Sequence, residues 1–142
     1  MPKTVAIIDG NSLMHRAFHA VPPAMQAPDG TPTNAAFGFL AMLIKFIEEQ
    51  HPDAIVWEGD DILGTLSAQN EKLGYNSLLV TGDKDAYQLA SDLTRIVTTK
   101  KGITDVVVYG PAEVEERYGV TPSQFTDFLG LKGDKADNIP GV

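Results

Sequence analysis

Short apolar runs alternate with helix-like segments along this sequence, and that alternation limits the folds open to it. The runs at 4–9, 53–57, 76–80, 94–99 and 106–109 are rich in β-branched and aliphatic residues, as buried strands are. Segments with helical spacing or helix start and stop signals separate several of these runs. This order predicts a mainly parallel sheet flanked by helices on both faces, in a single α/β domain over residues 1–142.

Helix boundaries follow from capping and stop residues. Asn34 is a candidate cap for a helix in which Phe37, Leu40, Leu43, Ile44 and Ile47 recur at helical spacing. The other expected helices end at Gly74, lie near Tyr87–Leu89, run from Pro111 to Gly119, and follow the Thr-x-x-Gln capping box at Thr121 through Leu129. The proline-rich stretch 19–33 is expected to be a loop.

Composition excludes several classes of protein. The chain has no Cys, which excludes disulfides and thiolate metal sites and fits a reducing cytoplasm. No run of about 18 apolar residues is present, so no membrane span is expected. A formal net charge of −8 argues against a nucleic-acid partner, unless the acids surround cations that neutralise them.

Acidic residues follow the ends of the first three expected strands. They are Asp9; then Glu58, Asp60 and Asp61; then Asp83 and Asp85. The carboxyl ends of parallel strands meet at one edge of a sheet, where such folds place their sites. Asp134 and Asp137, three residues apart in the terminal loop, could face the same way. Without these eight, the remaining 11 acids equal the 11 Lys and Arg residues.

Eight neighbouring carboxylates need a counter-charge. Two like charges at ~4 Å cost about 4 kcal/mol at an effective dielectric of 20. Oxygen ligands without Cys or a His cluster suit Mg²⁺ or Mn²⁺, and more than four ligands favour two ions, an arrangement used for in-line displacement at phosphorus. Each Asp could instead be a turn former or a helix cap, Asp60 or Asp61 for one helix and Asp85 for the next.

Four motifs carry a resemblance to a known family. "IIDGNSLMHRAFHA", "EGDDILGTLS", "LLVTGDKDAYQL" and "LGLKGDKADNIPGV" resemble the 5′-nuclease domain of bacterial DNA polymerase I and its flap-endonuclease relatives. The resemblance implies a PIN-like sandwich, two Mg²⁺ ions, and a DNA substrate, or an RNA primer, with a 5′ end or 5′ flap. It also implies a bacterial cytoplasmic monomer, which could be fused to a polymerase domain.

The resemblance also assigns roles to residues. Asp9, Glu58, Asp60 and Asp61 would belong to the catalytic metal cluster. Asp83 and Asp85 would serve both metals, and Asp134 and Asp137 would support the second. Arg16 and Lys84 match basic positions near the scissile phosphate, so the expected catalytic residues are Asp9, Arg16 and Lys84. For Lys84, a plain surface lysine is an equally open interpretation.

The sequence departs from the family pattern in two places. Relatives usually carry a metal-binding Asp and a basic helical clamp after the second strand, whereas here Trp57 runs directly into Glu58. In relatives a helix-hairpin-helix follows the position of Val142. The resemblance therefore implies a segment between Trp57 and Glu58 that is either omitted from the sequence or deleted from the protein, and a truncated C-terminal part.

Two functions remain open. The first is metal-assisted hydrolysis of phosphodiester bonds. The second is a catalytically crippled metal- and DNA-binding fragment of a larger polymerase. An aspartyl phosphatase is disfavoured, because Asn11 stands where that chemistry needs an acid two residues after Asp9. No P-loop motif is present.

Overall fold

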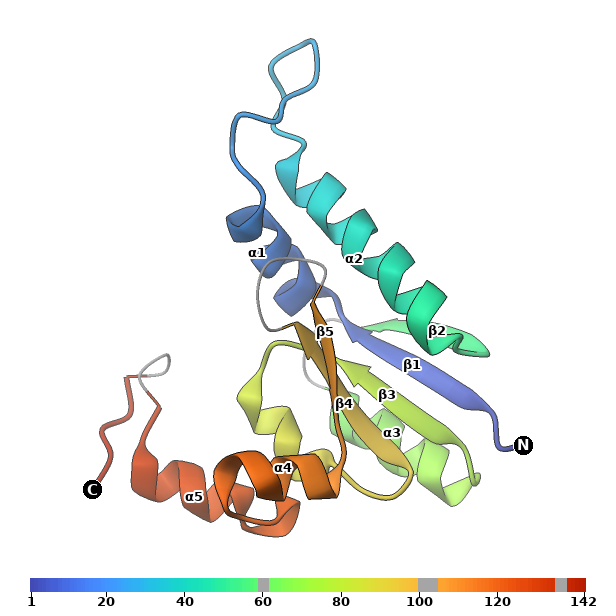
Figure 1. The fold of residues 1–142 in the computed structure, drawn as a ribbon, viewed down its shortest axis with the longest axis vertical. Helices are drawn as coiled ribbons and strands as arrows, with labels where there is room; N and C mark the ends of the chain where they lie inside the picture. Colours follow the sequence, from blue (N-terminus) through green and yellow to red (C-terminus); the bar gives the residue numbers. More distant parts are fainter. Residues whose placement is uncertain (59–61, 100–104, 135–137) are drawn as a thin grey trace.

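Five strands form one sheet in the order β2-β1-β3-β4-β5 (Figure 1). The computed structural model describes residues 1–58, 62–99, 105–134 and 138–142. β1 (Thr4–Asp9), β2 (Ala54–Glu58), β3 (Asn76–Val80) and β4 (Thr94–Thr99) are parallel, and β5 (Val106–Tyr109) pairs antiparallel with β4. The mainly parallel α/β sheet expected from the sequence is therefore confirmed.

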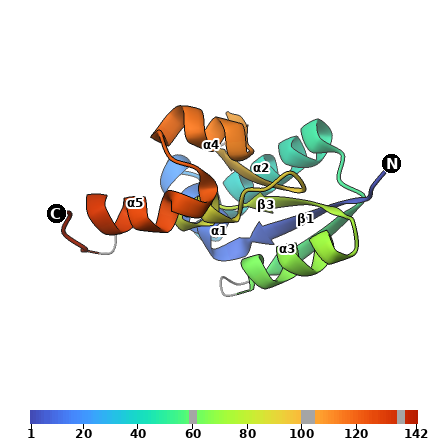
Figure 2. The ribbon, with the colours of Figure 1, turned by 90° about the horizontal axis from the view of Figure 1, so that it is seen from below.

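Helices lie on both faces of this sheet, and Figure 2 shows α2 and α3 on opposite sides of β1 and β3. α1 (Gly10–Ala20) and α2 (Asn34–Gln50) bury one apolar cluster against the sheet, with Ile8, Phe39 and Phe46 among its members. The opposite cluster contains Ile7, Leu79 and Phe125. It packs under α3 (Leu63–Lys72), the 3₁₀ helix η1 (Lys84–Leu89), α4 (Pro111–Tyr118) and α5 (Phe125–Lys132), which follows the 3₁₀ turn η2 (Pro122–Gln124).

Helix α1 is an element that the sequence analysis did not predict. Asp9 begins it as the N-cap, because its side chain accepts a hydrogen bond from the Ser12 N–H. The expected loop therefore starts at Val21 rather than at His19. None of the described helices is both long and apolar enough to cross a membrane.

Two elements present their apolar residues differently from the expectation. β2 was expected to be a buried strand, but it is an edge strand whose first four residues are exposed. In α2 the core side consists of Phe39, Met42 and Phe46. Of the expected stripe, only Leu43 packs partly against the core, whereas Phe37, Leu40, Ile44 and Ile47 face outward on the opposite side. α2 is apolar over much of its circumference, so spacing alone could not select its buried side.

The α4–α5 side is held by an aromatic cluster. The Tyr87 ring lies 5.1 Å from Tyr109 and 5.5 Å from Phe125, which is fully buried. Burial and the neighbouring Tyr118 raise the pKa of the Tyr87 hydroxyl well above its ordinary value, because a phenolate would lose hydration there. The cluster thus joins η1, which follows the end of β3, to the C-terminal helices α4 and α5.

Replacing Phe125 with Ala is expected to lower the free energy of unfolding by about 3–5 kcal/mol, because it removes a fully buried ring. The measurement is urea unfolding followed by circular dichroism. Phe18→Ala is the control, since that ring is half-exposed and its loss should change stability little. Equal losses in the two variants would contradict this view of the core.

Glu71 on α3 ties the helix to the connection before β4. Its Oε1 accepts hydrogen bonds from the hydroxyls of Ser91 and Thr94, and these bonds lower the pKa of the carboxyl below its ordinary 4.5. This stabilisation is present above pH ~4.5 and is lost as pH falls through the lower folded value. Glu71→Gln should therefore flatten the acid limb of a stability–pH curve, whereas the exposed-site variant Glu115→Gln should leave it unchanged.

Candidate metal centre

β1, β2 and β3 end at the same edge of the sheet, and each end carries a site residue or leads into one. Asp9 and Glu58 are register partners on the neighbouring strands β1 and β2. Neighbouring strands lie about 4.8 Å apart and paired residues share a face, so the two carboxylates are close neighbours. Both are buried, with exposed fractions of 1% and 7%. Asp83 and Asp85 follow β3 at the same edge.

The Asp9 carboxylate is fixed on both of its oxygens. Its Oδ1 accepts a 2.9 Å hydrogen bond from the Ser12 backbone N–H, at the N-terminus of α1. Its Oδ2 accepts a 2.6 Å hydrogen bond from the Thr81 hydroxyl. The positive end of the helix dipole and the two donors stabilise a negative charge in this buried position. A carboxylate has further oxygen lone pairs, which can bind a cation.

Thr81 links Asp9 to the acidic segment after β3. Its Oγ1, which donates to Asp9, also accepts a 3.1 Å hydrogen bond from the Asp83 N–H. Thr81 is 1% exposed, so the bonds form in a dry environment where losing one is costly. The orientation of Asp9 and the course of the chain at Asp83 therefore depend on one hydroxyl.

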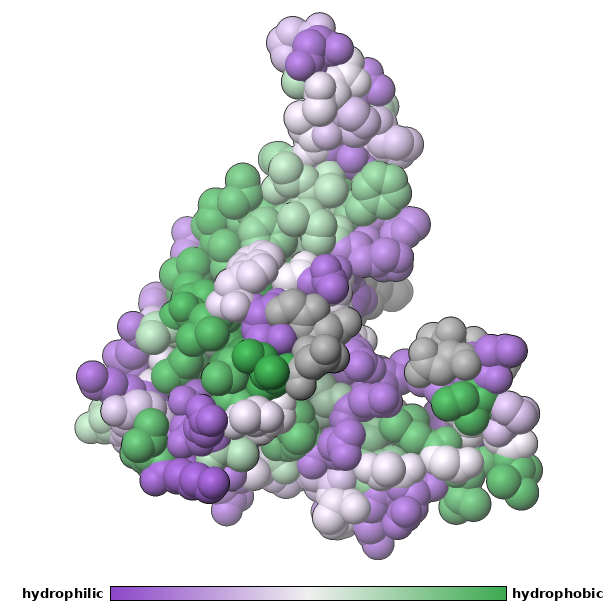
Figure 3. Space-filling model, turned by 180° about the vertical axis from the view of Figure 1, so that it is seen from behind, coloured by the Kyte–Doolittle hydropathy of each residue, from purple (hydrophilic) through white to green (hydrophobic). Residues whose placement is uncertain are grey.

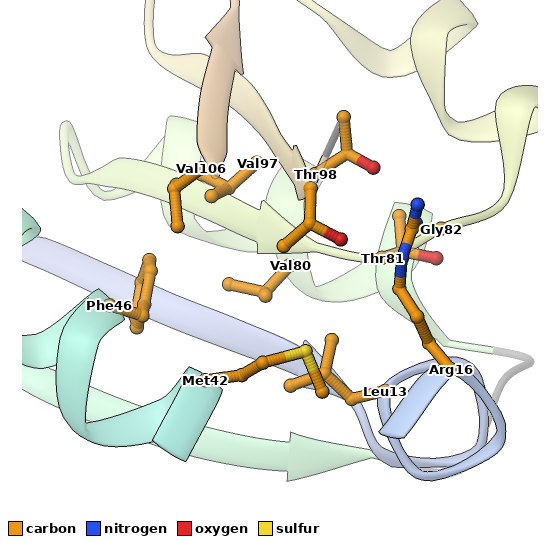
Figure 4. Close-up of a pocket in the computed structure, with 11 residues that line it drawn as sticks. Leu13, Arg16, Met42, Phe46, Val80, Thr81, Gly82, Val97, Thr98 and Val106 are labelled. Atoms are coloured by element: carbon orange, nitrogen blue, oxygen red, sulfur yellow. The ribbon is translucent and has the colours of Figure 1, made fainter. Parts of the chain in front are cut away.

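A second link joins α1 to the same segment. The Gly82 N–H donates to Ser12 Oγ at 2.7 Å. A Cβ at Gly82 would stand 2.8 Å from that oxygen and 3.5 Å from Arg16 Nη1, so the close approach needs glycine. Figure 4 shows the Arg16 side chain rising from α1 towards Thr81 and Gly82, at one side of an apolar pocket lined by Leu13, Met42 and Phe46. The structure thus places a guanidinium beside the acidic segment.

Asp83 and Asp85 project into solvent from the start of η1. Asp83 is the N-cap, and its Oδ1 accepts a 3.0 Å hydrogen bond from the Asp85 N–H. The sequence analysis allowed Asp85 to cap this helix, and that alternative is wrong. Asp85 lies in the first turn, where the exposed carboxylate can face a ligand.

Lys84 and Asp134 come together although 49 residues separate them in the sequence. Both line a hollow formed with Phe128, Lys132 and Gly133 at the end of α5. Asp134 also forms an isolated bridge with Ile139, which turns the terminal segment back on itself. The terminal acid therefore reaches the same end of the molecule as η1.

Three of the expected ligands, Asp60, Asp61 and Asp137, lie outside the described residues. Among residues 1–58, 62–99, 105–134 and 138–142, no three acidic or His side chains are close enough together to form a metal site. The described structure therefore brings Asp9, Glu58, Asp83 and Asp85 to one edge without closing a coordination shell. The assignment of all eight ligands stays a prediction.

The donor set fits a hard divalent cation. Every candidate ligand offers carboxylate oxygen, which Mg²⁺ and Mn²⁺ prefer. Asp9 and Glu58 are buried beside each other, so their negative charges need compensation. Two hydrogen-bond donors among the described residues supply part of that compensation at Asp9. A cation would complete that compensation.

Thr81 and Ser12 are site residues that the sequence analysis missed. The signals were present: Thr81 lies between a buried strand and the acids in "VTGDKD", and Ser12 stands three residues after Asp9. A Ser at that spacing supplies the N–H that an N-cap Asp accepts. The hydroxyl contacts could not have been found, because they join residues about 70 positions apart.

Comparison with known proteins identifies the family of this chain. The family described as "5'-3' exonuclease, N-terminal resolvase-like domain" matches residues 4–58 and 55–119. The chain therefore belongs to the 5′-3′ exonuclease N-terminal domain family, as the resemblance indicated. The match is in two parts that meet at residues 55–58, around the Trp57–Glu58 junction.

Proteins similar in sequence to this chain include bacterial DNA polymerases I. The chain is 35% identical over 192 residues to that of Bacillus subtilis (strain 168), covering 99% of this chain and 22% of the relative. It is 32% identical to that of Mycobacterium tuberculosis (strain H37Rv), covering 98% and 21%. The chain thus spans about a fifth of these relatives. The aligned lengths exceed its 142 residues, so the relatives contain residues that this chain lacks.

Solved structures share the fold. A T5 5′-exonuclease mutant matches with a TM-score of 0.68 at 16% identity, over 99% of this chain and 66% of that one. The bacteriophage T5 D15 flap endonuclease, solved with DNA and metal ions, matches with a TM-score of 0.65 at 14% identity, over 99% and 70%. At these identities the matches establish the α/β architecture of the 5′-nuclease fold.

Replacing Thr81 with Val is expected to lower the free energy of unfolding by about 1–3 kcal/mol, because Asp9 Oδ2 and the Asp83 N–H both lose a partner. Thr81→Ser keeps the hydroxyl and is the matched control. Urea unfolding without added metal measures the difference. If the two variants have equal stability, the hydroxyl does not hold Asp9 in place.

Proposed function

We propose that this domain is a divalent-metal-dependent 5′ nuclease, which hydrolyses phosphodiester bonds of DNA from a 5′ end or at a 5′ flap. The observation that carries the proposal is the gathering of Asp9, Glu58, Asp83 and Asp85 at one sheet edge of a 5′-3′ exonuclease family domain. Such an edge is where α/β sheets bind their ligands.

The proposed ligands of two Mg²⁺ or Mn²⁺ ions are the eight acids named from the sequence. Bound ions would lower the pKa of a water molecule and neutralise charge on the phosphate. The chain itself holds Asp9 through Ser12 and Thr81, and holds the Asp83 backbone through the same threonine. This arrangement sets the orientation of one ligand before any cation arrives.

Arg16 and Lys84 are proposed to bind the scissile phosphate. The Arg16 guanidinium lies beside Gly82, next to the acidic segment, and can offer paired N–H donors to phosphate oxygens. Lys84 is exposed between Asp83 and Asp85 and offers a point charge. Both would stabilise negative charge that develops on the phosphate oxygens.

The proposed partners follow from the relatives. DNA with a free 5′ end or flap is the substrate class, and an RNA primer paired with DNA has the same chemistry at its 5′ end. In the relatives this region is part of a polymerase, so a role in DNA replication and repair in the bacterial cytoplasm is proposed with it.

A second candidate function is favoured by the divided family match. The residues that relatives carry near the Trp57–Glu58 junction are absent, and the chain outside the eight acids has no excess of basic residues to neutralise phosphates. This candidate is a catalytically inactive fragment that binds metal and binds DNA weakly.

Cleavage of a 5′-flap DNA in Mg²⁺ is expected, with loss on chelation by EDTA. Asp83→Asn and Asp9→Asn should each reduce the cleavage rate more than about 100-fold, because a charged metal ligand is lost. Glu115→Gln, an exposed change on α4, is the control and should cleave at the original rate.

DNA binding measured by fluorescence anisotropy in Ca²⁺ separates the two candidates. Binding without cleavage in Mg²⁺ or Mn²⁺ would support the inactive fragment. Cleavage that survives both the Asp9 and the Asp83 changes would contradict the proposed metal centre.

A further inference from the structure

The sheet has an open edge whose four exposed residues are all uncharged. β2 lies at the end of the strand order and pairs with β1 alone within the described sheet. Its residues 54–57, Ala-Ile-Val-Trp, are exposed and uncharged, and the strand contains no Pro, Lys or Arg. Exposed edge strands normally carry such residues, because free N–H and C=O groups attract another strand.

An apolar stripe on α2 extends this edge. Phe37, Leu40, Ile44 and Ile47 recur on one side of the helix, away from its buried side. With Ile55, Val56 and Trp57 they make seven large apolar side chains that are 37–55% exposed. Ile55 and Trp57 lie on the α2 side of the sheet, and Val56, the register partner of Ile7, lies at the same edge on the α3 side. Figure 3 shows hydrophobic residues gathered along the side of the molecule where α2 and β2 lie. We call these seven residues the α2–β2 face.

The α2–β2 face is large enough for a protein interface. At about half exposure, such side chains contribute roughly 90 Å² each, or roughly 600 Å² together, near the roughly 800 Å² per partner of a standard interface. The backbone of β2 adds to that area on pairing. A single apolar patch of this size is unusual unless it binds something.

The comparisons indicate why the face is open in this chain. The family match divides at residues 55–58, and the relatives' alignments are longer than the chain. The relatives therefore carry residues next to β2 in sequence that this chain lacks. A chain without them leaves β2 free to pair with another molecule.

We propose that the α2–β2 face binds a second copy of this chain, with the two β2 strands pairing antiparallel around a twofold axis at Val56. Val56 is the central residue of β2, so this register pairs all five residues. It places Glu58 opposite Ala54 and Trp57 opposite Ile55, so that no two like charges oppose each other. The two sheets become one continuous ten-stranded sheet.

Charge is compatible with this arrangement. Each copy carries a net charge of −8, which opposes association. In an antiparallel pairing the carboxyl edges of the two sheets point in opposite directions, so the acidic rims lie at opposite ends of the strand pair. The α2 stripe itself carries no charge, and Lys45 and Glu49 on the same helix neutralise each other in an ion pair of 3.5 Å. Glu48, one turn after Ile44, adds one negative charge beside the stripe.

The other edge of the sheet is a weaker candidate. β5 has four residues, of which Val106, Val107 and Val108 are half-buried. No exposed apolar helix stripe continues it among the described residues. The proposed dimer therefore uses β2, and it differs from the monomer that the resemblance implies.

A cysteine at position 56 tests the register directly, because the chain has no other Cys. Opposed residues of an antiparallel pair have Cα atoms about 4.5–5.5 Å apart, within the range of a disulfide. V56C should form a covalent dimer on mild oxidation, whereas E115C, on exposed α4, should not.

Sedimentation at about 100 µM tests dimerisation through the α2–β2 face, because a dimer with a micromolar Kd is the main species at that concentration. The chain should sediment as a dimer, and I44E should weaken dimerisation at least about 10-fold. L131E, at an exposed apolar residue on α5, is the matched control and should remain dimeric. Circular dichroism checks that both variants fold.

Several results would overturn the proposal. They are a monomer at that concentration, a dimer that resists I44E, open-ended aggregates, or a V56C chain that does not cross-link. The remaining case is tested with a chimera, in which the additional segment of the Bacillus subtilis relative is inserted after Trp57. The chimera would be a monomer, and the inserted segment would protect its β2 amides from hydrogen exchange. That result would assign the face to an intramolecular segment. Because no arm measures nuclease activity, the outcome is independent of the proposed function.

Discussion

The hydrogen bond from Thr81 to Asp9 is the contact on which the site depends. It joins the end of β1 to the residue after β3, and it holds a buried carboxylate whose other oxygen is fixed by the N-terminus of α1. The same hydroxyl receives the Asp83 N–H, so the course of the acidic segment is set from one point. A buried carboxylate is tolerated here because donors surround it.

The fold creates this contact by a general feature of parallel sheets. Strands that run the same way end at one edge, so residues remote in sequence meet there without a dedicated loop. Asp9 and Glu58 are 49 positions apart, yet they are register partners at adjacent strand ends. Six of the eight acids that equal the net charge of −8 lie at or just after these strand ends in the sequence, where bound cations would neutralise them.

The α2–β2 region shows that the exposure of a side chain depends on its neighbours in the fold. Phe37 and Phe39 are both apolar residues of one helix, yet Phe39 packs against Trp57 with ring centres 4.9 Å apart while Phe37 is half-exposed. β2 has the composition of a buried strand, yet it is exposed, because no strand pairs with its outer edge in the described sheet. Burial therefore depends on neighbours that the local sequence does not contain.

The sequence by itself determined the strands, since β1, β3, β4 and β5 have the bounds expected from their β-branched runs, and it determined that Asp9, Glu58, Asp83 and Asp85 follow strand ends. Local propensity and turn chemistry suffice for that, because they act over a few residues. The N-caps at Asp9 and Asp83 are contacts over two or three residues, so their signals are local as well, although the sequence analysis did not assign them. Only the tertiary structure decided that the Thr81 hydroxyl holds Asp9, that the Ser12 hydroxyl holds Gly82, and which side of α2 is buried. These features arise from contacts between residues far apart in the chain, whose energy depends on packing and geometry that no local pattern records.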